Sequence, residues 1–307
     1  MFATKCTSMQ RLIFVISYPF LWVLAILPFP LLYMISDFVY LWVYHVIGYR
    51  RKVVEQNLAL AFPKLSASKR NKIRKEFYHY FCDSFLEMIK TLKMSDEQLK
   101  TRFKILNPEL LKEIEGQKKS YILLMGHYAS YEWVHALHFH SITFKAYGVY
   151  KPIKNKYFDK LIRKIRGKYN THMLPNKTVP KIMLKNKKNK TLSSYGLVAD
   201  QSPRPKNAKH YVNFFNHKVP SFVGPEYLAK KLNLSVVYLK VNKVKRGRYE
   251  AELLPITYTP KRYEDFKLTD LYYDLLEKQI NENPAYYLWT HKRWKHKLSG
   301  FDAEKTS

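Results

Sequence analysis

Cysteine and acidic residues are both scarce in this 307-residue chain. The two cysteines, Cys6 and Cys82, form neither a Cys-x-x-Cys pair nor a disulfide framework, which excludes a zinc ribbon and favours a reducing compartment. Cys82 falls in a helical apolar pattern and is interpreted as helix packing. Asp and Glu number 24 against 54 Lys and Arg, a formal charge of +30. This excess predicts an anionic partner, and both nucleic acid and phospholipid headgroups meet that description.

Charged residues are absent from Leu12–Ile35, a run dominated by apolar and aromatic side chains. Because roughly 20 apolar residues cross a bilayer core, we expect a membrane anchor here, with a buried core helix as the alternative. The run lacks the shorter apolar region and small-residue cleavage site of a signal peptide. Pro28 and Pro30 are expected to end or kink the helix. The next apolar piece, Phe38–Ile47, is too short to span alone and is expected to continue bent or to lie in the interface.

Basic residues predict the orientation of this anchor. Arg50, Arg51 and Lys52 directly follow the apolar pieces, and the rest of the chain is strongly basic. The positive-inside rule therefore predicts that the body of the protein faces the cytoplasm. We expect residues 1–48 to form a transmembrane or interfacial anchor and residues 49–307 to form the functional domain.

Residues 49–101 have helical patterns. One helix is expected at Arg50–Ala61, and Ser66 is expected to cap a longer one. The apolar stripe of the longer helix runs from Ile73 through Phe85 to Leu92 with the three-and-four spacing of a buried face.

From residue 102 to residue 298, short β-type runs alternate with helical patterns. This alternation predicts an α/β fold whose mostly parallel, twisted sheet is flanked by helices. Strands are expected at Phe103–Leu106, Tyr121–Met125, Phe144–Val149, Thr191–Ala199, Ser235–Val244 and Tyr249–Ile256. Helices are expected at Ser130–His140, Asn155–Tyr169, Val179–Asn186 and Pro220–Asn233.

The segment Lys181–Lys190 is strongly basic. A solvated helix end explains it without a specific function. A contact with lipid phosphates or with an acidic carrier protein is the functional alternative.

The window Tyr121–His140 is the most informative about chemistry. An apolar strand leads into Gly126 and His127, and Glu132 follows five positions later. On a continuous helix, residues five apart differ by about 140° in direction. We therefore expect His127 in a loop, with a helix from near Ser130 that brings Glu132 back to it.

In that arrangement Glu132 would hydrogen-bond one imidazole nitrogen of His127. The other nitrogen would then take a proton from a substrate hydroxyl, which attacks a thioester carbonyl. Backbone N–H groups at the helix N-terminus would stabilise the oxyanion. A hydrogen-bonded loop histidine is the alternative, because His-x4-Glu alone is a weak signal. His135, His138 and His140 lack the HExxH pattern, so we expect no metal site.

The whole chain resembles the bacterial late acyltransferases of lipid A biosynthesis, a branch of the lysophospholipid acyltransferase superfamily. The resemblance rests on an ordered set of six blocks: YRRKVVEQNLALAFP (Tyr49–Pro63), GHYASYEW (Gly126–Trp133), VYKPIKNKYFDKLIRKIRGKYN (Val149–Asn170), GLVADQSP (Gly196–Pro203), FFNHKVPSFVGPEYLAKKLNLSVV (Phe214–Val237) and YYLWTHKRWK (Tyr286–Lys295). The chain departs from the family at Asn216, where glycine is frequent, and at Lys151, where arginine is common.

The resemblance implies a glycerolipid-acyltransferase-like fold in which His127 and Glu132 are catalytic and Arg166 and Asp200 bind substrate in the same site. It also implies an acyl-carrier-protein or coenzyme A thioester as donor and a lipid A precursor, or a related membrane lipid, as acceptor. An arginine suits an anionic headgroup or a thioester oxygen, although Arg166 has a solvated cation as its alternative. Asp200 follows a strand, where α/β sheets carry site residues, although a turn cap would also explain it.

These implications predict an enzyme of the inner membrane, facing the cytoplasm, that needs no cofactor or metal. The alternative functional class is a basic, aromatic-rich nucleic-acid-binding protein. The uncharged Leu12–Ile35 run argues against that class, because a soluble binder has no use for it, and no nucleic-acid partner is expected.

Overall fold

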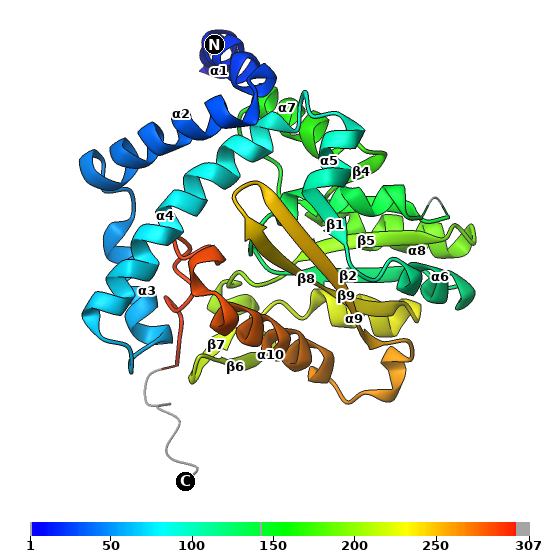
Figure 1. Ribbon diagram of the computed structural model, residues 1–307. Helices are drawn as coiled ribbons and strands as arrows, with labels where there is room; N and C mark the ends of the chain where they lie inside the picture. Colours follow the sequence, from blue (N-terminus) through cyan, green and yellow to red (C-terminus); the bar gives the residue numbers. More distant parts are fainter. Residues whose placement is uncertain (1, 142, 299–307) are drawn as a thin grey trace.

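Proline divides the N-terminal apolar region into two helices. The computed structural model, which describes residues 2–141 and 143–298, has α1 at Phe2–Ile26 and α2 at Phe29–Leu41, continued by a π-helical turn at Trp42–Val46 (Figure 1). Pro28 precedes α2 and Pro30 lies in its first turn, where helices tolerate proline. Ser8–Ile26 and Phe29–Val46 are each long and apolar enough to cross a membrane. The expected break at the prolines is confirmed.

Two further helices, α3 (Arg51–Ala61) and α4 (Ala67–Lys90), complete the N-terminal layer. The hydroxyl of Ser66 caps α4 by accepting the N–H of Lys69, as expected. Cys82 is buried in α4, which confirms its packing role, whereas the side chain of Cys6 lies outside the described residues.

The predicted buried face of α4 is wrong at Phe85, which is 55% exposed. The buried face instead includes two carboxylates, Asp83 and Glu87. Glu87 accepts hydrogen bonds from the hydroxyls of Tyr33 and Tyr249, each at 2.8 Å. The spacing of apolar residues does not predict such positions, because carboxylates can be buried when they have hydrogen-bond partners.

Arg246, at the tip of a long hairpin, joins α2 to α4. Its guanidinium group donates to Asp37 of α2 at 2.7 Å and to Asp83 of α4 at 2.7 Å. Ser36 of α2 also donates to Asp83, at 2.7 Å. Buried Asp83 of α4 thus accepts hydrogen bonds from Ser36 of α2 and from Arg246 of the hairpin. These bonds hold α2, α4 and the hairpin together.

Seven strands form the main sheet in the order β1-β9-β8-β2-β5-β3-β4. Neighbours pair parallel except β8 and β9, which form the antiparallel hairpin that carries Arg246. The mostly parallel α/β sheet is therefore confirmed. The strands are β1 (Phe103–Ile105), β2 (Tyr121–Met125), β3 (Lys145–Tyr150), β4 (Thr171–Pro175), β5 (Ser193–Val198), β8 (Ser235–Lys245) and β9 (Arg248–Thr257); β6 (Tyr211–Phe214) and β7 (His217–Pro220) form a separate hairpin.

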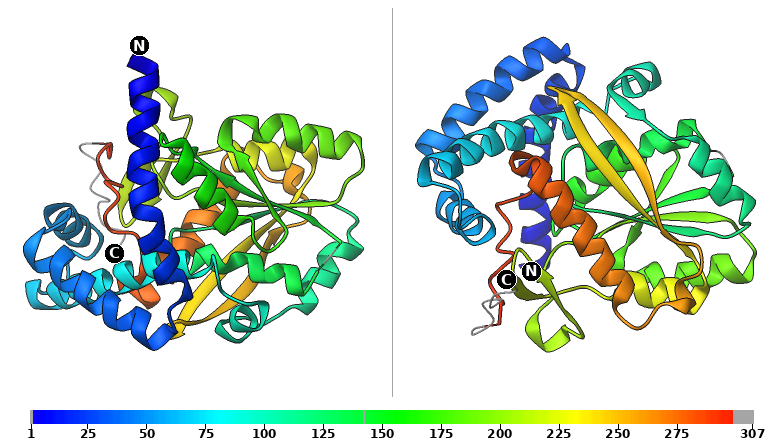
Figure 2. Two further views of the ribbon diagram at one scale, coloured as in Figure 1. Left: turned by 90° about the horizontal axis from the view of Figure 1, so that it is seen from above. Right: turned by 60° about the horizontal axis from the view of Figure 1, so that its bottom comes forward.

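Helices flank this sheet (Figure 2). They are α5 (Asp96–Arg102), α6 (Glu109–Gly116), α7 (Lys156–Arg166), α8 (Val179–Lys188), α9 (Gly224–Leu232) and α10 (Lys267–Glu282). Short 3-10 helices lie at Tyr131–Phe139, Asn176–Thr178, Pro205–Asn207, Pro260–Arg262 and Pro284–Tyr286.

Several elements differ from the expectation. The helix expected at Ser130–His140 is the 3-10 helix Tyr131–Phe139, and β4, α10 and the β6–β7 hairpin were not anticipated. The hairpin turns at Phe215 and Asn216, whose φ values are 51° and 59°. Asn tolerates this left-handed conformation, so the chain makes the turn with Asn where the related family often has glycine.

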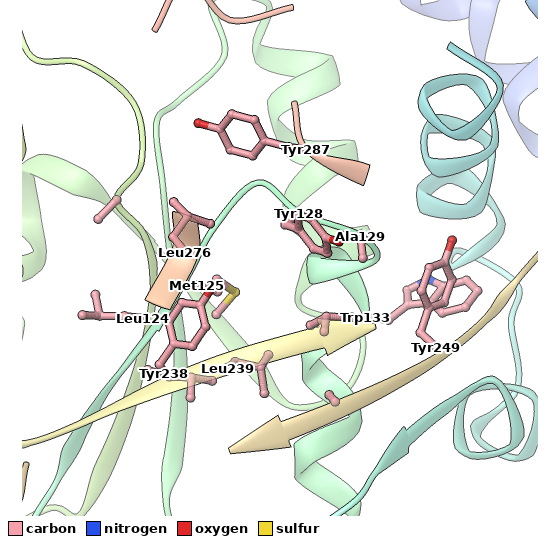
Figure 3. Packing of buried hydrophobic residues seen from close by; sticks show 14 of the residues in the cluster. Leu124, Met125, Tyr128, Ala129, Trp133, Tyr238, Leu239, Tyr249, Leu276 and Tyr287 are labelled. Carbon is pink, nitrogen blue, oxygen red and sulfur yellow. The ribbon is translucent and has the colours of Figure 1, made fainter. Parts of the chain in front are cut away.

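Part of the core lies around the carboxyl end of β2, beside β8 and β9 (Figure 3). Leu124 and Met125 pack beside Tyr238 and Leu239, while Trp133 lies edge-on to Tyr249 with ring centroids 5.5 Å apart. This packing holds the carboxyl end of β2 rigidly, and the candidate site begins at the next residues.

Candidate active site

The loop after β2 is held from two sides. A side chain at Gly126 would put its Cβ 2.5 Å from a methyl of Leu276 in α10, so glycine permits the close approach. The C-terminal segment pairs with the next residues: Ala129 donates to the carbonyl of Tyr286, and Leu288 donates to the carbonyl of His127. The C-terminal signature therefore has a structural role, which is to fix the backbone around His127. Figure 3 shows Tyr287 of this segment near Tyr128 and Ala129.

Asp200, just after β5, is the partner of His127. Its Oδ1 lies 2.6 Å from Nδ1 of His127, and its Oδ2 accepts the His127 backbone N–H at 3.3 Å. The side chain of Asp200 is 2% exposed, so solvent does not compete for these bonds. Since β2 and β5 are parallel neighbours, their carboxyl ends meet at one edge of the sheet and bring the two residues together.

Two tyrosines of α10 hold the strand ends that carry this pair. Tyr272 donates to the carbonyl of Met125, and Tyr273 donates to the carbonyl of Ala199. These carbonyls end β2 and directly precede Asp200. The unanticipated helix α10 thus fixes the separation between the imidazole and its carboxylate.

Asp200 is ionised in this setting. Burial alone would raise its pKa, but the charge of His127, the hydrogen bonds from His127 and the nearby charge of Arg293 outweigh burial, so the pKa lies below its ordinary value. Arg293 is itself fully buried, donates to Ser202 at 2.8 Å and lies over the rings of Phe214 and Tyr273.

Glu132 is bonded to Arg166, which corrects the expected His127–Glu132 hydrogen bond. The guanidinium group of Arg166 donates through Nε to Oε2 at 2.8 Å and through Nη2 to Oε1 at 2.5 Å. The 3-10 helix begins one residue before Glu132 and directs it toward the last turn of α7, where the planar fork of Arg166 matches a carboxylate. Asp200 then fills the role at Nδ1 that spacing alone had suggested for Glu132.

The Arg166–Glu132 pair is an ion pair. Burial would raise the pKa of Glu132, but the charge and hydrogen bonds of Arg166 outweigh it and hold the pKa below its ordinary value. Burial alone would lower the pKa of Arg166, but the charge and hydrogen bonds of Glu132 outweigh burial, so the pKa is raised above its ordinary value. Arg166 is therefore not a solvated surface cation.

A cavity of about 380 Å³ runs from these two pairs along one face of the sheet. His127, Glu132 and Arg166 line one end, together with Lys151 and Gln201. The remaining lining is Tyr121, Leu123, Met125, Tyr131, Val134, His135, Leu137, His138, Ser141, Phe144, Ala146, Tyr147, Gly148, Val149, Tyr150, Thr171, Met173, Ser194, Gly196 and Val198.

Small residues in register make room for this cavity. Gly196 of β5 lies opposite Leu123 of β2 on one side and Gly148 of β3 on the other. A Cβ at Gly196 would lie 3.4 Å from the terminal methyl of Met125, a lining residue. The floor of the cavity is therefore sensitive to any added side-chain atom on these two strands.

Gln201 is a site residue that sequence reasoning missed. Its side-chain Nε2 lies 3.4 Å from Nε2 of His127, the ring nitrogen that Asp200 does not hold. It directly follows Asp200 in the GLVADQSP block, and that adjacency was the available signal. The amide therefore stands beside the ring nitrogen that faces the cavity.

The other histidines have different environments. His135 is buried and stacked on Tyr169, and burial lowers its pKa to about 4. His135 and His138 line the cavity, whereas His140 is exposed. Among the residues that the structure describes, no group of three or more His, Cys, Asp or Glu is placed to hold a metal ion.

The basic segment Lys181–Lys190 ends at the opposite edge of the sheet from His127. It covers most of α8 and the turn into β5, and its lysines are exposed. Its last residues precede the amino end of β5, whereas Asp200 follows the carboxyl end. This position favours a solvated helix end over a contact with a substrate at His127.

Known proteins resemble the chain over nearly its full length. The model of the bacterial lipid A biosynthesis acyltransferase family matches residues 1–296. A lipid A biosynthesis lauroyltransferase of Escherichia coli (strain K12) is 25% identical over 283 residues, covering 91% of this chain and 90% of the relative. A lipid A biosynthesis acyltransferase of Haemophilus influenzae is 28% identical over 280 residues, covering 88% and 86%.

A further relative differs in the acyl chain named. A lipid A biosynthesis palmitoleoyltransferase of Escherichia coli (strain K12) is 22% identical over 277 residues, covering 90% of this chain and 88% of the relative. The resemblance seen in the six sequence blocks is thereby confirmed. The chain belongs to the bacterial lipid A biosynthesis acyltransferase family.

Proposed function

We propose that this chain transfers a fatty acyl group from an acyl-carrier-protein or coenzyme A thioester to a hydroxyl of a lipid A precursor. The observation that carries the proposal is the His127–Asp200 pair at one end of a 380 Å³ cavity. A buried carboxylate behind an imidazole, with a cavity beside it, suits a general base that activates a hydroxyl for attack on a thioester. A glycerolipid-acyltransferase-like fold is part of the same proposal.

In the proposed reaction, Asp200 accepts a hydrogen bond from Nδ1–H of His127, which leaves the lone pair on Nε2. Nε2 takes the proton of the acceptor hydroxyl while the hydroxyl oxygen attacks the thioester carbonyl carbon. Collapse of the tetrahedral intermediate breaks the C–S bond, and the leaving thiolate takes the proton back from Nε2. The products are an ester and a free thiol, and the balance requires no cofactor.

Gln201 and Arg166 are the proposed stabilisers of the oxyanion. The Gln201 amide lies beside the reactive nitrogen of His127 and carries N–H donors. Arg166 is fixed by Glu132 through Nε and Nη2, which leaves the N–H groups of Nη1 to meet a substrate oxygen. Glu132 thus acts through Arg166 in this proposal, as a positioning residue.

The donor acyl chain is proposed to lie along β2 in the cavity. Tyr121 and Met125, which line it, are four residues apart, or about 13 Å at about 3.3 Å per residue. Carbon–carbon bonds of about 1.5 Å at tetrahedral angles advance about 1.25 Å per carbon, so this length holds about ten carbons. With the carbonyl carbon and its neighbour near His127, a chain of about 12 carbons is the proposed donor.

The proposed location is the cytoplasmic face of the inner membrane, with residues 1–48 as the membrane attachment and residues 49–307 as the acyltransferase domain. The apolar helices α1 and α2 support a lipid surface over a nucleic acid as the anionic partner. The acceptor alternatives are another glycolipid, an aminolipid or a lysophospholipid.

The test is an acyl-transfer assay with the purified full-length protein in detergent micelles. Donors are 12-carbon thioesters of acyl-carrier protein and coenzyme A, and acceptors are a lipid A precursor, a lysophospholipid and an aminolipid. We expect thiol release and a mass gain of one acyl group on the lipid A precursor, both lost in His127→Ala. Thiol release without an acylated lipid, or preference for another acceptor, would contradict the proposal.

A further inference from the structure

We infer that α1 lies flat in the cytoplasmic leaflet, together with α2, and does not cross the bilayer. The inference deepens the proposed membrane location and rests on it, but it is independent of the chemistry at His127. It revises the expectation that the uncharged run spans the membrane, and the packing of α1 against the body carries it.

One face of α1 is partly covered by protein from Gln10 to Ala25. The partly or fully buried positions share a three-and-four spacing and are Gln10, Phe14, Ser17, Tyr18, Leu21, Leu24 and Ala25. The large apolar residues between them are exposed by two fifths or more and include Leu12, Ile16, Phe20 and Val23. Such a stripe describes a helix lying along the body (Figure 2, left), in which the other faces are open to lipid.

Two separate elements make these contacts at the two ends of the stripe. Near the start, Asn155 donates to the carbonyl of Gln10, and Phe14 stacks on Tyr157 at the beginning of α7. Near the end, the ammonium group of Lys90 in α4 donates to the carbonyl of Ala25. The two contact points are fifteen residues apart, about 22 Å along the helix axis.

This spacing is incompatible with a helix that crosses the bilayer. If α1 stood upright with its Ala25 end at the cytoplasmic boundary, Asn155 would lie about 22 Å into a hydrocarbon core about 30 Å thick. Lys154 and Lys156 flank Asn155 and are exposed. Charged side chains at that depth are strongly disfavoured, whereas a flat α1 keeps α7 at the level of the headgroups.

The second helix presents a matching surface. α2 buries Phe29, Leu32, Ser36 and Tyr40 against the body, and its outer stripe of Leu31, Met34, Phe38 and Leu41 is exposed. The two helices meet at Leu27 and Pro28 and run in different directions, with α1 seen nearly end-on where α2 lies in the page (Figure 1). The exposed apolar faces of α1 and α2 together form a broad apolar surface, called the platform below. Such a surface suits a leaflet better than a single transmembrane span does.

The occupant of this platform is a leaflet of anionic phospholipid. Lys93 lies over the ring of Trp22 at 5.6 Å, and Arg11, Lys154 and Lys156 are exposed at the other end of α1. Aromatic residues and cations at the border of an apolar surface match the headgroup layer. Lys151 lines the cavity and is exposed, three residues before Lys154. A flat α1 therefore keeps this part of the cavity lining near the headgroup layer.

Thiol labelling of the full-length protein tests the orientation of α1. In a Cys6→Ser background, Ser8→Cys is exposed to a membrane-impermeant maleimide in spheroplasts and in inverted inner-membrane vesicles. A flat helix predicts labelling only in the inverted vesicles, as for the control Lys112→Cys on α6. Labelling of Ser8→Cys only in spheroplasts would overturn the inference.

Nitroxide depth measurements decide the case in which Ser8→Cys is shielded from the reagent. Spin labels at Met9→Cys, Phe20→Cys and Ile26→Cys are measured in vesicles of phosphatidylethanolamine and phosphatidylglycerol. We expect all three within one leaflet, with no maximum of oxygen accessibility along α1. A depth that passes through the bilayer centre between Met9 and Ile26 would also overturn the inference. Loss of the protein from the membrane pellet would instead contradict the proposed location itself.

Discussion

Two hydrogen-bonded pairs face the same end of the cavity, yet they differ in kind. His127–Asp200 joins a titratable base to a carboxylate, whereas Arg166–Glu132 joins a permanent cation to a carboxylate. Both carboxyl groups have pKa values below the ordinary value. Only the first pair is able to accept and return a proton, because the guanidinium group stays charged at any working pH. The difference assigns proton transfer to one pair and fixed positive charge to the other.

The largest effect is expected at the base itself. His127→Ala should lower kcat by about 10³- to 10⁴-fold, because it removes the imidazole that Asp200 holds at the end of the cavity and that takes the hydroxyl proton in the proposed reaction. Acyl transfer is measured by mass spectrometry, and membrane pelleting reports that the protein is intact. The matched control is His140→Gln on the exposed histidine, which should keep the parent rate. A His127→Ala enzyme within tenfold of the parent would remove the base from the mechanism.

Replacing each carboxylate by its amide sets the two pairs directly against each other. Asp200→Asn should cost about 10³-fold in kcat, because the amide holds the wrong tautomer of His127. Glu132→Gln should lower kcat only about 10- to 100-fold, because Arg166 keeps its charge and is held less firmly in position. Steady-state kinetics of both variants test this. Equal losses, or a larger loss in Glu132→Gln, would reverse the roles assigned to the two pairs.

Arg166→Lys tests whether the Arg166–Glu132 pair contributes only a positive charge to the site. Lysine keeps the charge and loses the planar fork that bonds Glu132 at two points. We expect kcat to fall about tenfold at saturating substrate while KM changes less, measured over a range of acceptor concentrations. The surface replacement Arg163→Lys, on the same helix, is the control. A change confined to KM would mean that Arg166 only binds the substrate.

Gly196→Val changes the cavity while leaving both hydrogen-bonded pairs intact. The added side chain would enter the floor near Met125. We expect kcat/KM for a 12-carbon donor to fall roughly tenfold, and an eight-carbon donor to change much less. Gly116→Val is the control, because a Cβ at Gly116 meets nothing within 4 Å. An equal loss with both donors would indicate a general distortion of the sheet.

The smallest effect is expected at a neighbouring histidine. Burial lowers the pKa values of His135 and His291 to about 4, so both imidazoles are neutral from pH 8 to pH 5. His135→Asn should therefore change kcat less than twofold at every pH between 5 and 8, as measured in the acyl-transfer assay. A loss in His135→Asn that varies with pH in this range would show that His135 changes its protonation state there and takes part in the reaction.

The four candidate site residues that the sequence singled out lie close together in the structure, but their pairing was not predictable from the sequence. His127 and Glu132 share one block, and a local motif invites a local pair. The partner of His127 comes from β5, 73 positions away, through a parallel pairing of strands that spacing does not reveal. The alternation of elements did predict the parallel sheet. The helix α10 was missed although its buried residues, among them Leu268, Tyr272, Leu276 and Ile280, recur with helical spacing. The burial of Asp83 and Glu87 depends on tertiary hydrogen bonds, which leave no periodic signal in the sequence.

The guanidinium group of Arg246, which donates to Asp37 and Asp83, is synthesised long after both of these residues. Asp37 and Arg246 are 209 positions apart, so the apolar helices leave the ribosome long before their partner exists. Until the hairpin arrives, Asp83 lacks its guanidinium partner, and an unpaired carboxylate opposes burial. At the proposed membrane location, lipid would cover α1 and α2 during that interval, so membrane attachment would be an early step and closure of the sheet a late one. A chain begun at residue 49 would reach the late step without Ser36 or Asp37 to meet the hairpin.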